Sequence, residues 1–250
     1  MNLSNRIKDK ASELGFSKTG IVAADALDAE AANLHQWLTR GLNADMTWME
    51  ANLEKRTDPR VLFPGARSIV VVAQNYYTDH KHDEAQGRGK ISRYAWGDDY
   101  HDVVHEKLKE LLAWIKVNEP SADGKICVDT APMMDKAWAV RAGIGWLGKH
   151  SNVITTEIGS WIFIGSIILN IDLEYGQRDR RRSLRNMHRL PRCVPDVGHN
   201  RTLPRRFEKM HLIRDNRAAG RIAAPRDRRT SRWLDLRLRH MSGHMPMEPL

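Results

Sequence analysis

The stretch RSIVVVAQ, residues 67–74, is a continuous apolar and β-branched run that follows a Pro-Gly pair at 64–65. A run of this length behind a turn signal is typical of a strand buried on both faces. A second apolar run, WIFIGSIIL at 161–169, is also of strand length and is interrupted by a glycine. Both runs predict strands, and burial of the first on both faces predicts a sheet with other elements packed on each face. This arrangement is typical of a layered α/β fold.

Segments with apolar residues at helical spacing lie before and between these two runs. Val104, Leu108 and Ile115 form an apolar stripe, and similar stripes predict helices over 7–14 and 27–42. Further predicted elements are helices over 46–53 and 133–141, strands over 19–23 and 126–128, and a hairpin of 152–155 with 160–169. The order predicts an α/β (α+β) domain with a mixed sheet and flanking helices.

Charge divides the chain into two parts. The 250 residues carry 40 Lys and Arg against 31 Asp and Glu, a net charge of +9. Residues 176–250 hold 19 of the Arg, one Lys and seven acidic residues, so residues 1–175 have a net charge of −4. The second part shows no sustained apolar period, and we expect it to be irregular or disordered. Residues 1–175 and 176–250 are therefore predicted as separate units.

Composition excludes several classes of protein. A hydrophobic content of 41% is too high for a disordered polymer. No run of about 18 apolar residues exists, so a membrane span is not expected. The start, MNLSNRIKDK, lacks the apolar region of a secretion signal. Two cysteines give no disulfide framework, and together these features predict a protein of the reducing cytoplasm.

Asp129 is the first candidate catalytic residue. It ends the predicted strand at 126–128 and is followed by Thr-Ala-Pro, with apolar Val128 and Pro132 nearby. A carboxyl group in apolar surroundings has a raised pKa and can act as a general acid. The alternative is a structural one, in which Asp129 is the N-cap of the helix that follows Pro132.

Two other segments combine polar, aromatic and glycine residues. KISRYAWGDDYH, residues 90–101, sets aromatic rings among charges, which suits a planar ligand, although Asp98 or Asp99 is also explained as an N-cap. GIGWLGKH, residues 143–150, lacks the P-loop ending and the dinucleotide glycine spacing. We interpret its glycines as a place where the backbone comes close to a ligand.

Taken in order, the motifs resemble one family throughout residues 1–175. The segments are RTDPRVLFPGARSIVVVAQNY, ISRYAWGDDYH, VDTAPMMDKAWAVRAGIGWLGKHS and GSWIFIGSIIL, and they are similar to epoxyqueuosine reductases. The resemblance implies a cobalamin-dependent oxidoreductase that reduces epoxyqueuosine to queuosine in tRNA, the last step of queuosine biosynthesis. In that chemistry reduced cobalt attacks the epoxide carbon and an acid protonates the leaving oxygen.

The resemblance also implies roles for individual residues. Asp129 matches the proton donor of the VDTAP-type motif. The cobalamin-contacting motifs contain Arg56, Arg93, Tyr94, Tyr100, His101, His150, Ser151 and Thr155. The expected partner is a tRNA that carries epoxyqueuosine, and we expect a monomer, as in the family.

After residue 175 the sequence departs from the family. The resemblance implies a ferredoxin-like segment there, with cysteines in the pattern C-x2-C-x2-C-x3-C-P and two [4Fe–4S] clusters. In residues 176–250 the only cysteine is Cys193, so this segment lacks the ligands for even one such cluster. We therefore expect the chain as written to show no turnover.

The genetic code offers an explanation. Residues 184–196 can be encoded so that a reading one base later gives CGTCTACLDACP, the absent cysteine pattern. Residues 233–249, shifted in the same direction, give GWTCGYDICQDICPWN. We interpret residues 176–250 as an out-of-frame reading. The alternatives are a cobalamin-binding module without redox activity and a basic protein that binds RNA through an Arg-rich tail.

Overall fold

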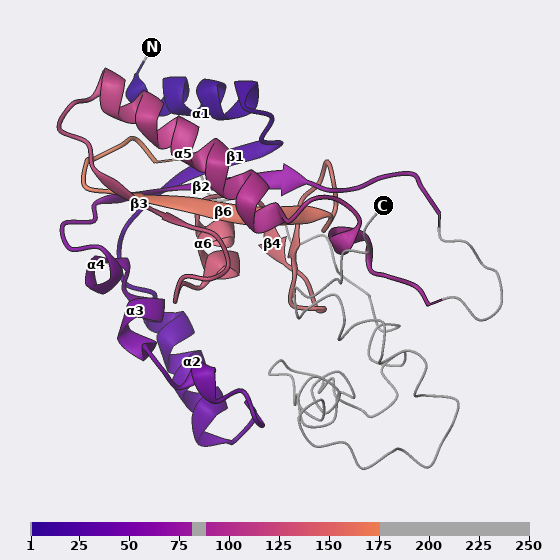
Figure 1. The fold of residues 1–250 in the computed structure, drawn as a ribbon. Helices are drawn as coiled ribbons and strands as arrows, with labels where there is room; N and C mark the ends of the chain where they lie inside the picture. The colour runs from indigo at the N-terminus through magenta and orange to yellow at the C-terminus, as the bar shows by residue number, and fades with distance from the viewer. Residues whose placement is uncertain (1, 82–88, 176–250) are drawn as a thin grey trace, which may run out of the picture.

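The computed structural model describes residues 2–81 and 89–175. Their centre is a four-stranded sheet with strand order β1-β2-β6-β3 (Figure 1). The strands are β1 (Lys18–Ala23), β2 (Ser68–Asn75), β3 (Gly124–Cys127) and β6 (Ile162–Leu169). The expected α/β class with flanking helices is confirmed. All three pairings are antiparallel, however, so the sheet is not of mixed direction.

Helices cover both faces of the sheet. In Figure 1, α1 (Leu3–Glu13) and α5 (Tyr100–Asn118) lie on one face, and α6 (Asp135–Arg141) lies on the other. Side chains of β2 alternate between the two: Val70 and Val72 pack with α1 and α5, whereas Ile69 and Val71 pack with α6. This double cover explains why the strand reads as a continuous apolar run although its neighbours are antiparallel.

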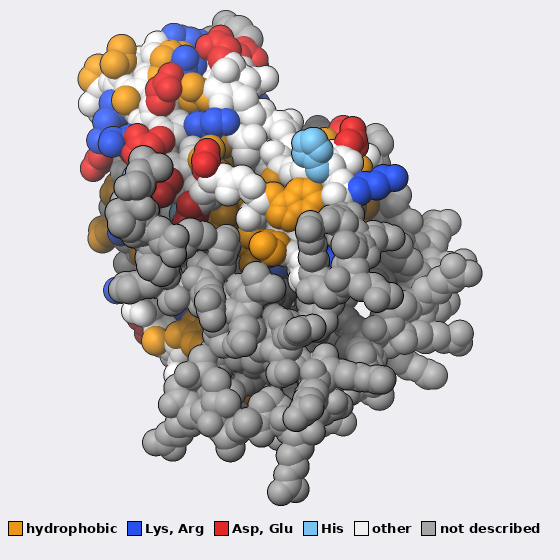
Figure 2. Space-filling model, turned by 45° about the vertical axis from the view of Figure 1, so that its right-hand side comes forward, with side chains coloured by type: hydrophobic (Ala, Val, Ile, Leu, Met, Phe, Trp, Pro, Cys, Tyr) orange, Lys and Arg blue, Asp and Glu red, His pale blue; other side chains and the backbone are white. Residues whose placement is uncertain are grey.

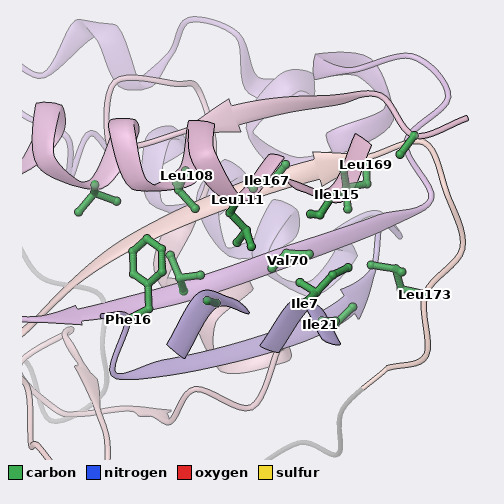
Figure 3. Close-up of a cluster of buried hydrophobic side chains, with 14 of the residues drawn as sticks. Ile7, Phe16, Ile21, Val70, Leu108, Leu111, Ile115, Ile167, Leu169 and Leu173 are labelled. Carbon is green, nitrogen blue, oxygen red and sulfur yellow. The ribbon is translucent and has the colours of Figure 1, made fainter. Parts of the chain in front are cut away.

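The larger core fills the space between α1, α5 and the sheet. Figure 3 shows Ile7, Leu108, Leu111 and Ile115 pointing toward β2 and β6. These four side chains are fully buried, as the helical spacing predicts. The core therefore holds α5 against the sheet, and the beginning of α5 lies near the sheet end where β3 stops.

An arm of short helices separates β1 from β2. It contains α2 (Asp28–Thr39), the 3₁₀ turn η1 (Thr47–Met49), α3 (Leu53–Thr57) and α4 (Pro59–Leu62), and it extends away from the sheet (Figure 1). The predicted helix over 46–53 is wrong, because only the 3₁₀ turn forms there. Asn52 adopts a left-handed conformation with φ of 57°, which ends any helix at that point.

A small second sheet lies beside α6. It pairs β4 (Trp146–Leu147) with β5 (Val153–Ile154), and η2 (Arg93–Ala95) is a separate 3₁₀ turn. The predicted hairpin of 152–155 with 160–169 is wrong, because β6 pairs with β2 and β3. A Cβ on Gly145 would lie 2.0 Å from the Ile154 oxygen. The pairing of β4 with β5 therefore requires glycine at residue 145. The Gly145 backbone approaches the strand β5 closely, and not a ligand as the sequence predicted.

Residues 176–250 lie outside the described residues, and so do the predictions that concern them. In the part of the chain that is described, no helix is both long enough and apolar enough to cross a bilayer.

Candidate active site

Asp129 follows β3 in a tight loop. Its backbone is left-handed, with φ of 51°, and the next amide, of Thr130, donates to the Val128 oxygen at 2.5 Å. The Asp129 side chain is 66% exposed, so the expectation of a buried, apolar setting is wrong. The N-cap alternative also fails, because α6 begins after Met134 and has no side-chain cap. The carboxylate is therefore available to other groups.

His101 connects Asp129 to a second carboxylate. Its Nδ1 lies 2.7 Å from Asp99 Oδ1, and its Nε2 lies 3.4 Å from Asp129 Oδ2. Asp99 also accepts from the His101 amide at 2.9 Å, as the N-cap of α5. Burial lowers the pKa of His101, but the hydrogen bonds to Asp99 and Asp129 outweigh it, and the pKa is raised. The imidazolium form is favoured between the two acids.

Tyr100 packs beside this pair. Its ring stacks on Phe163 at 4.1 Å and lies 4.0 Å from the His101 ring. Burial raises the pKa of Tyr100 well above its usual range, and Asp129 adds to the effect through its charge and a hydrogen bond. The hydroxyl therefore keeps its proton and serves as a donor near Asp129.

Arg93 and Tyr94 come from η2. The Arg93 guanidinium lies 5.1 Å from the Tyr77 ring centre and 5.3 Å from that of Trp161, and it donates to the His80 oxygen at 3.1 Å. Tyr94 is 52% exposed. Figure 2 shows one face of the molecule, on which hydrophobic side chains lie beside a histidine side chain with charged side chains near them. This part of the site combines aromatic faces with a cation.

The segment around β5 carries the other predicted contacts. His150 Nε2 lies 3.1 Å from Ser160 Oγ, and Ser151 is left-handed with φ of 63°. Lys136 of α6 donates to the Ser151 oxygen at 3.0 Å and so ties this loop to α6. Thr155 is buried, and its hydroxyl donates to the Gly159 oxygen at 3.2 Å. The polar atoms of this segment mainly shape its own turns.

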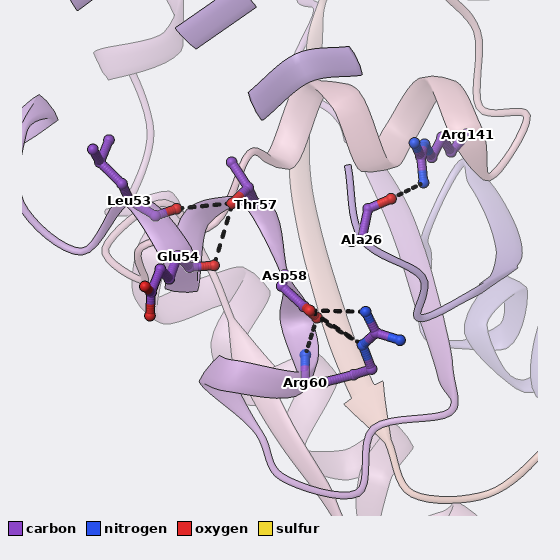
Figure 4. Close-up of polar contacts among 7 residues, drawn as sticks. All are labelled: Ala26, Leu53, Glu54, Thr57, Asp58, Arg60 and Arg141. Carbon is purple, nitrogen blue, oxygen red and sulfur yellow. Dashed lines mark hydrogen bonds and ion pairs between the residues drawn. The ribbon is translucent and has the colours of Figure 1, made fainter. Parts of the chain in front are cut away.

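Arg56 lies on the arm, and its side chain donates hydrogen bonds to backbone oxygens of the arm. It donates to the Trp48 oxygen at 3.0 Å and to the Ala51 oxygen at 3.2 Å. Figure 4 shows the adjoining turn, where Asp58 caps α4 and pairs with Arg60 at 2.8 Å. These bonds hold the end of η1 against α3, and none of them joins Arg56 to the cluster around Asp129.

Asp135 is a residue that the sequence motifs did not single out. It begins α6, and its Oδ1 is buried with no hydrogen-bond partner. Burial, together with the negative charge of Asp129, raises the pKa of Asp135 to about 7. In the sequence it resembles an ordinary acid in the first turn of a helix. Only the packing against β3 and the Asp129 loop distinguishes it.

The chain is similar to known proteins. The family model described as "Epoxyqueuosine reductase QueG, DUF1730" matches residues 56–130, which include Tyr100, His101 and Asp129. The epoxyqueuosine reductase of Cellulophaga algicola is 44% identical over 172 residues, which are 69% of this chain and 56% of that protein. The solved epoxyqueuosine reductase of Streptococcus thermophilus superposes with a TM-score of 0.79 at 29% identity, over 86% of this chain and 58% of that one.

Two further solved structures inform the site. One is an epoxyqueuosine reductase with a tRNA-Tyr epoxyqueuosine-modified stem loop, with a TM-score of 0.72 and 30% identity over 78% of this chain and 52% of that one. Another, from Bacillus subtilis, has an aspartate catalytic loop swung out of the active site, with a TM-score of 0.70 and 28% identity over the same shares. The chain spans about half the length of the curated relatives it matches. Over the described residues, the chain is therefore a homologue of the epoxyqueuosine reductases.

Proposed function

We propose that residues 1–175 form the cobalamin- and substrate-binding half of an enzyme that reduces epoxyqueuosine to queuosine in tRNA. The single observation that carries the proposal is the position of Asp129, exposed at the end of β3 within reach of His101. The relative with a bound tRNA stem loop supports the substrate, and the relative with an aspartate catalytic loop supports the role of Asp129. Such a substrate, together with the low cysteine content, supports a cytoplasmic protein.

Several residues of the described part of the chain suit cobalamin, a large ligand with a planar ring and many amide groups. Tyr94, Trp161 and Leu147 are exposed apolar side chains that offer faces to a ring. Tyr100, His101, Arg93, His150 and Ser151 offer donors or acceptors for amides. When bound, the reduced cofactor would supply the electron pair that opens the epoxide. Thr155 and Arg56 would act indirectly, by shaping the loop and the arm.

The protein's own residues contribute a proton to the reduction of the epoxide. Reduction of an epoxide to an alkene consumes two electrons and two protons and releases one water. Asp129 donates one of these protons to the epoxide oxygen as the first carbon–oxygen bond breaks, and water supplies the second proton as the resulting hydroxyl group leaves as water. His101 holds the Asp129 carboxyl group in place, and Asp99 in turn orients the His101 ring. The hydrogen bonds from Asp99 to His101 and from His101 to Asp129 position the acid. Asp99 and His101 are themselves held in place by the start of α5.

A cobalamin-binding module without redox activity is the second candidate. The observation that favours it is the count of two cysteines in the whole chain, which are too few for one [4Fe–4S] cluster. Under the out-of-frame interpretation of residues 176–250, both candidate functions derive from the same gene. A gene with the frame restored would encode the reductase, and the chain as written would retain the module.

The test compares the chain as written with a chain from the frame-restored gene. We expect both to bind cobalamin, measured by its visible absorbance. With a chemical electron donor, the restored chain converts epoxyqueuosine to queuosine in tRNA, measured by mass spectrometry of the nucleosides, and the chain as written does not. Asp129→Asn in the restored chain keeps cobalamin binding and loses conversion. A folded chain that binds no cobalamin would contradict the proposal.

A further inference from the structure

The arm between β1 and β2 is held together by its own contacts. Asn43 is buried just beyond the end of α2 and donates to Glu50 Oε1 at 2.8 Å. Arg56 of α3 donates to the backbone oxygens of Trp48 and Ala51. Within the arm, α2 packs against α3 and α3 against α4. The arm is therefore a compact unit, and its position relative to the sheet depends on the contacts at its base.

Two backbone hydrogen bonds close the base of the arm. The Leu27 amide donates to the Thr57 oxygen at 2.8 Å. The Ala24 amide donates to the Arg67 oxygen at 2.9 Å, directly beyond the paired strands β1 and β2. Leu27 is the N-cap residue of α2 and makes no side-chain cap hydrogen bond. These contacts join the arm to the sheet, but they leave the direction of α2 to be fixed by side chains near its first turn.

Arg141, the last residue of α6, reaches this first turn. Its Nη1 donates to the Ala26 oxygen at 3.0 Å (Figure 4), and its Nη2 lies 3.4 Å from Glu30 Oε2. The side chains of Arg141 and Glu30 are 18% and 32% exposed, so water screens this pair less than it screens a surface pair. The guanidinium also lies 5.6 Å from the centre of the Trp138 ring. A planar guanidinium holds a carbonyl and a carboxylate at once in one fixed geometry.

The beginning of α6 holds a second part of the site. Lys136 donates to the Ser151 oxygen at 3.0 Å and to Asn152 Oδ1 at 2.8 Å, in the turn between β4 and β5. Arg141 follows five positions later and therefore lies on a different side of the helix. The loop that contains Asp129 leads into α6. One helix of seven residues thus ties the β4–β5 turn and the arm to the element that follows the candidate catalytic residue.

Both parts that α6 holds carry an exposed apolar side chain. Trp48 of the arm is 52% exposed, and Leu147 of β4 is 48% exposed. In Figure 1 the arm and β4 lie on the same side of the sheet as α6. A ligand as large as cobalamin can contact several elements at once, and it binds more tightly when those elements are already held in their bound positions. The position of the arm relative to α6 therefore bears on the affinity for such a ligand.

We infer that Arg141 is a positioning residue for cofactor binding, which fixes the arm against α6 without itself contacting the cofactor. The inference rests on the proposed function and deepens it, because it assigns the arm to the cobalamin-binding face. Arg141 holds the start of α2 through the Ala26 oxygen and Glu30, and the compact arm follows its base. Without these bonds the arm takes several orientations. Only a fraction of the molecules is then ready to bind cobalamin, and the apparent affinity falls by that fraction.

The first test measures cobalamin affinity of the purified full-length chain by titration of the visible absorbance. We expect Arg141→Gln to weaken binding about tenfold, the effect of losing one charge-assisted hydrogen bond. Arg141→Lys keeps the charge near Glu30 and should weaken binding less. Arg6→Gln is the matched control. Arg6 also lies over a tryptophan, Trp114 at 5.3 Å, and donates to Asn118, but on the opposite face of the sheet. This control should leave the affinity unchanged.

Hydrogen–deuterium exchange of the same proteins reports on the arm directly, with no cofactor needed. Arg141→Gln should speed exchange in residues 24–31, where the Leu27 amide is bonded at the base of the arm, and leave residues 104–115 of α5 unchanged. In the parent chain, added cobalamin should slow exchange within the arm. A role of Arg141 in fold stability alone would instead speed exchange in both segments.

Three results would overturn the inference. They are an unchanged cobalamin affinity in Arg141→Gln, an equal loss of affinity in Arg141→Gln and Arg6→Gln, and unchanged exchange in residues 24–31. If Arg141→Gln fails to fold, Glu30→Gln decides instead, because it weakens the same pair from the arm and should lower the affinity in the same direction. A folded parent chain that binds no cobalamin would refute the proposed function, whereas the exchange measurement would still show whether Arg141 holds the arm.

Discussion

Asp135 makes the stability of the described domain depend on pH. Its pKa in the folded chain is about 7, above the ordinary value of 3.8, so the folded state binds a proton that the unfolded state releases. Its unfavourable effect is absent below about pH 4, grows as the pH rises, and is complete above about pH 7. We expect Asp135→Asn to stabilise the chain at pH 8, by at most about 4 kcal/mol, and to have little effect at pH 4.

Urea denaturation of the parent and the variant at both pH values measures this difference. Asp102→Asn is a suitable control, because Asp102 is exposed in the first turn of α5. A variant that is less stable than the parent at pH 8 would show that Asp135 stabilises the fold as an ion, contrary to the sign expected here.

His101 gives a second prediction for a single residue. Hydrogen bonds to Asp99 and Asp129 raise its pKa, so it stabilises the fold below its unfolded pKa and loses this effect as the pH rises through the folded value. Asp99→Asn removes the nearer carboxylate but keeps a side chain that caps a helix well. We expect the midpoint of the His101 proton NMR titration to fall while the helix content stays the same. An unchanged midpoint would mean that Asp99 does not hold the imidazolium.

Among the elements, β1 lies very close to the end of α6. A Cβ on Gly20 would lie 2.0 Å from the Ala142 oxygen, a backbone atom that cannot move alone. Gly20→Ala should therefore push α6 away from the sheet and cost about 1–3 kcal/mol or more of unfolding free energy. Gly97→Ala, where nothing lies within 4 Å, is the matched control and should change stability little. Urea denaturation of both variants measures the contrast, and equal effects would contradict the close packing.

The elements also show which patterns mislead. Residues 46–53 have a helical composition, but Asn52 turns left-handed and leaves only the η1 turn. Residues 152–155 and 160–169 are close in sequence, and a hairpin was the simplest pairing for them. β6 instead joins β2 and β3, because eight paired residues with β2 bury far more apolar surface than a short local hairpin would.

For the whole molecule, the out-of-frame interpretation makes a direct prediction. Because the chain contains two cysteines, we expect the purified protein to hold no stoichiometric iron and to lack the broad absorbance of [4Fe–4S] clusters near about 400 nm. Resequencing the gene across the codons for 169–192 and beyond 250 should restore one base and open the cysteine-rich frame. An unchanged genomic sequence, together with specific, salt-sensitive RNA binding that is lost on deletion of 176–250, would favour the Arg-rich RNA-binding alternative.

The sequence by itself determined the buried strand β2, the apolar face of α5 and a helix cap at Asp98 or Asp99, because each depends on neighbours within a few residues. The motifs in their order along the chain determined the similarity to the family. Tertiary structure alone decided the antiparallel order of the sheet, the exposure of Asp129 and the burial of Asp135. His101 meets Asp129 across 28 residues, and Arg67 and Asp172 pair across 105. The burial and the electrostatic environment of a residue depend on all the groups that folding brings around it. Residue spacing along the chain does not specify those groups.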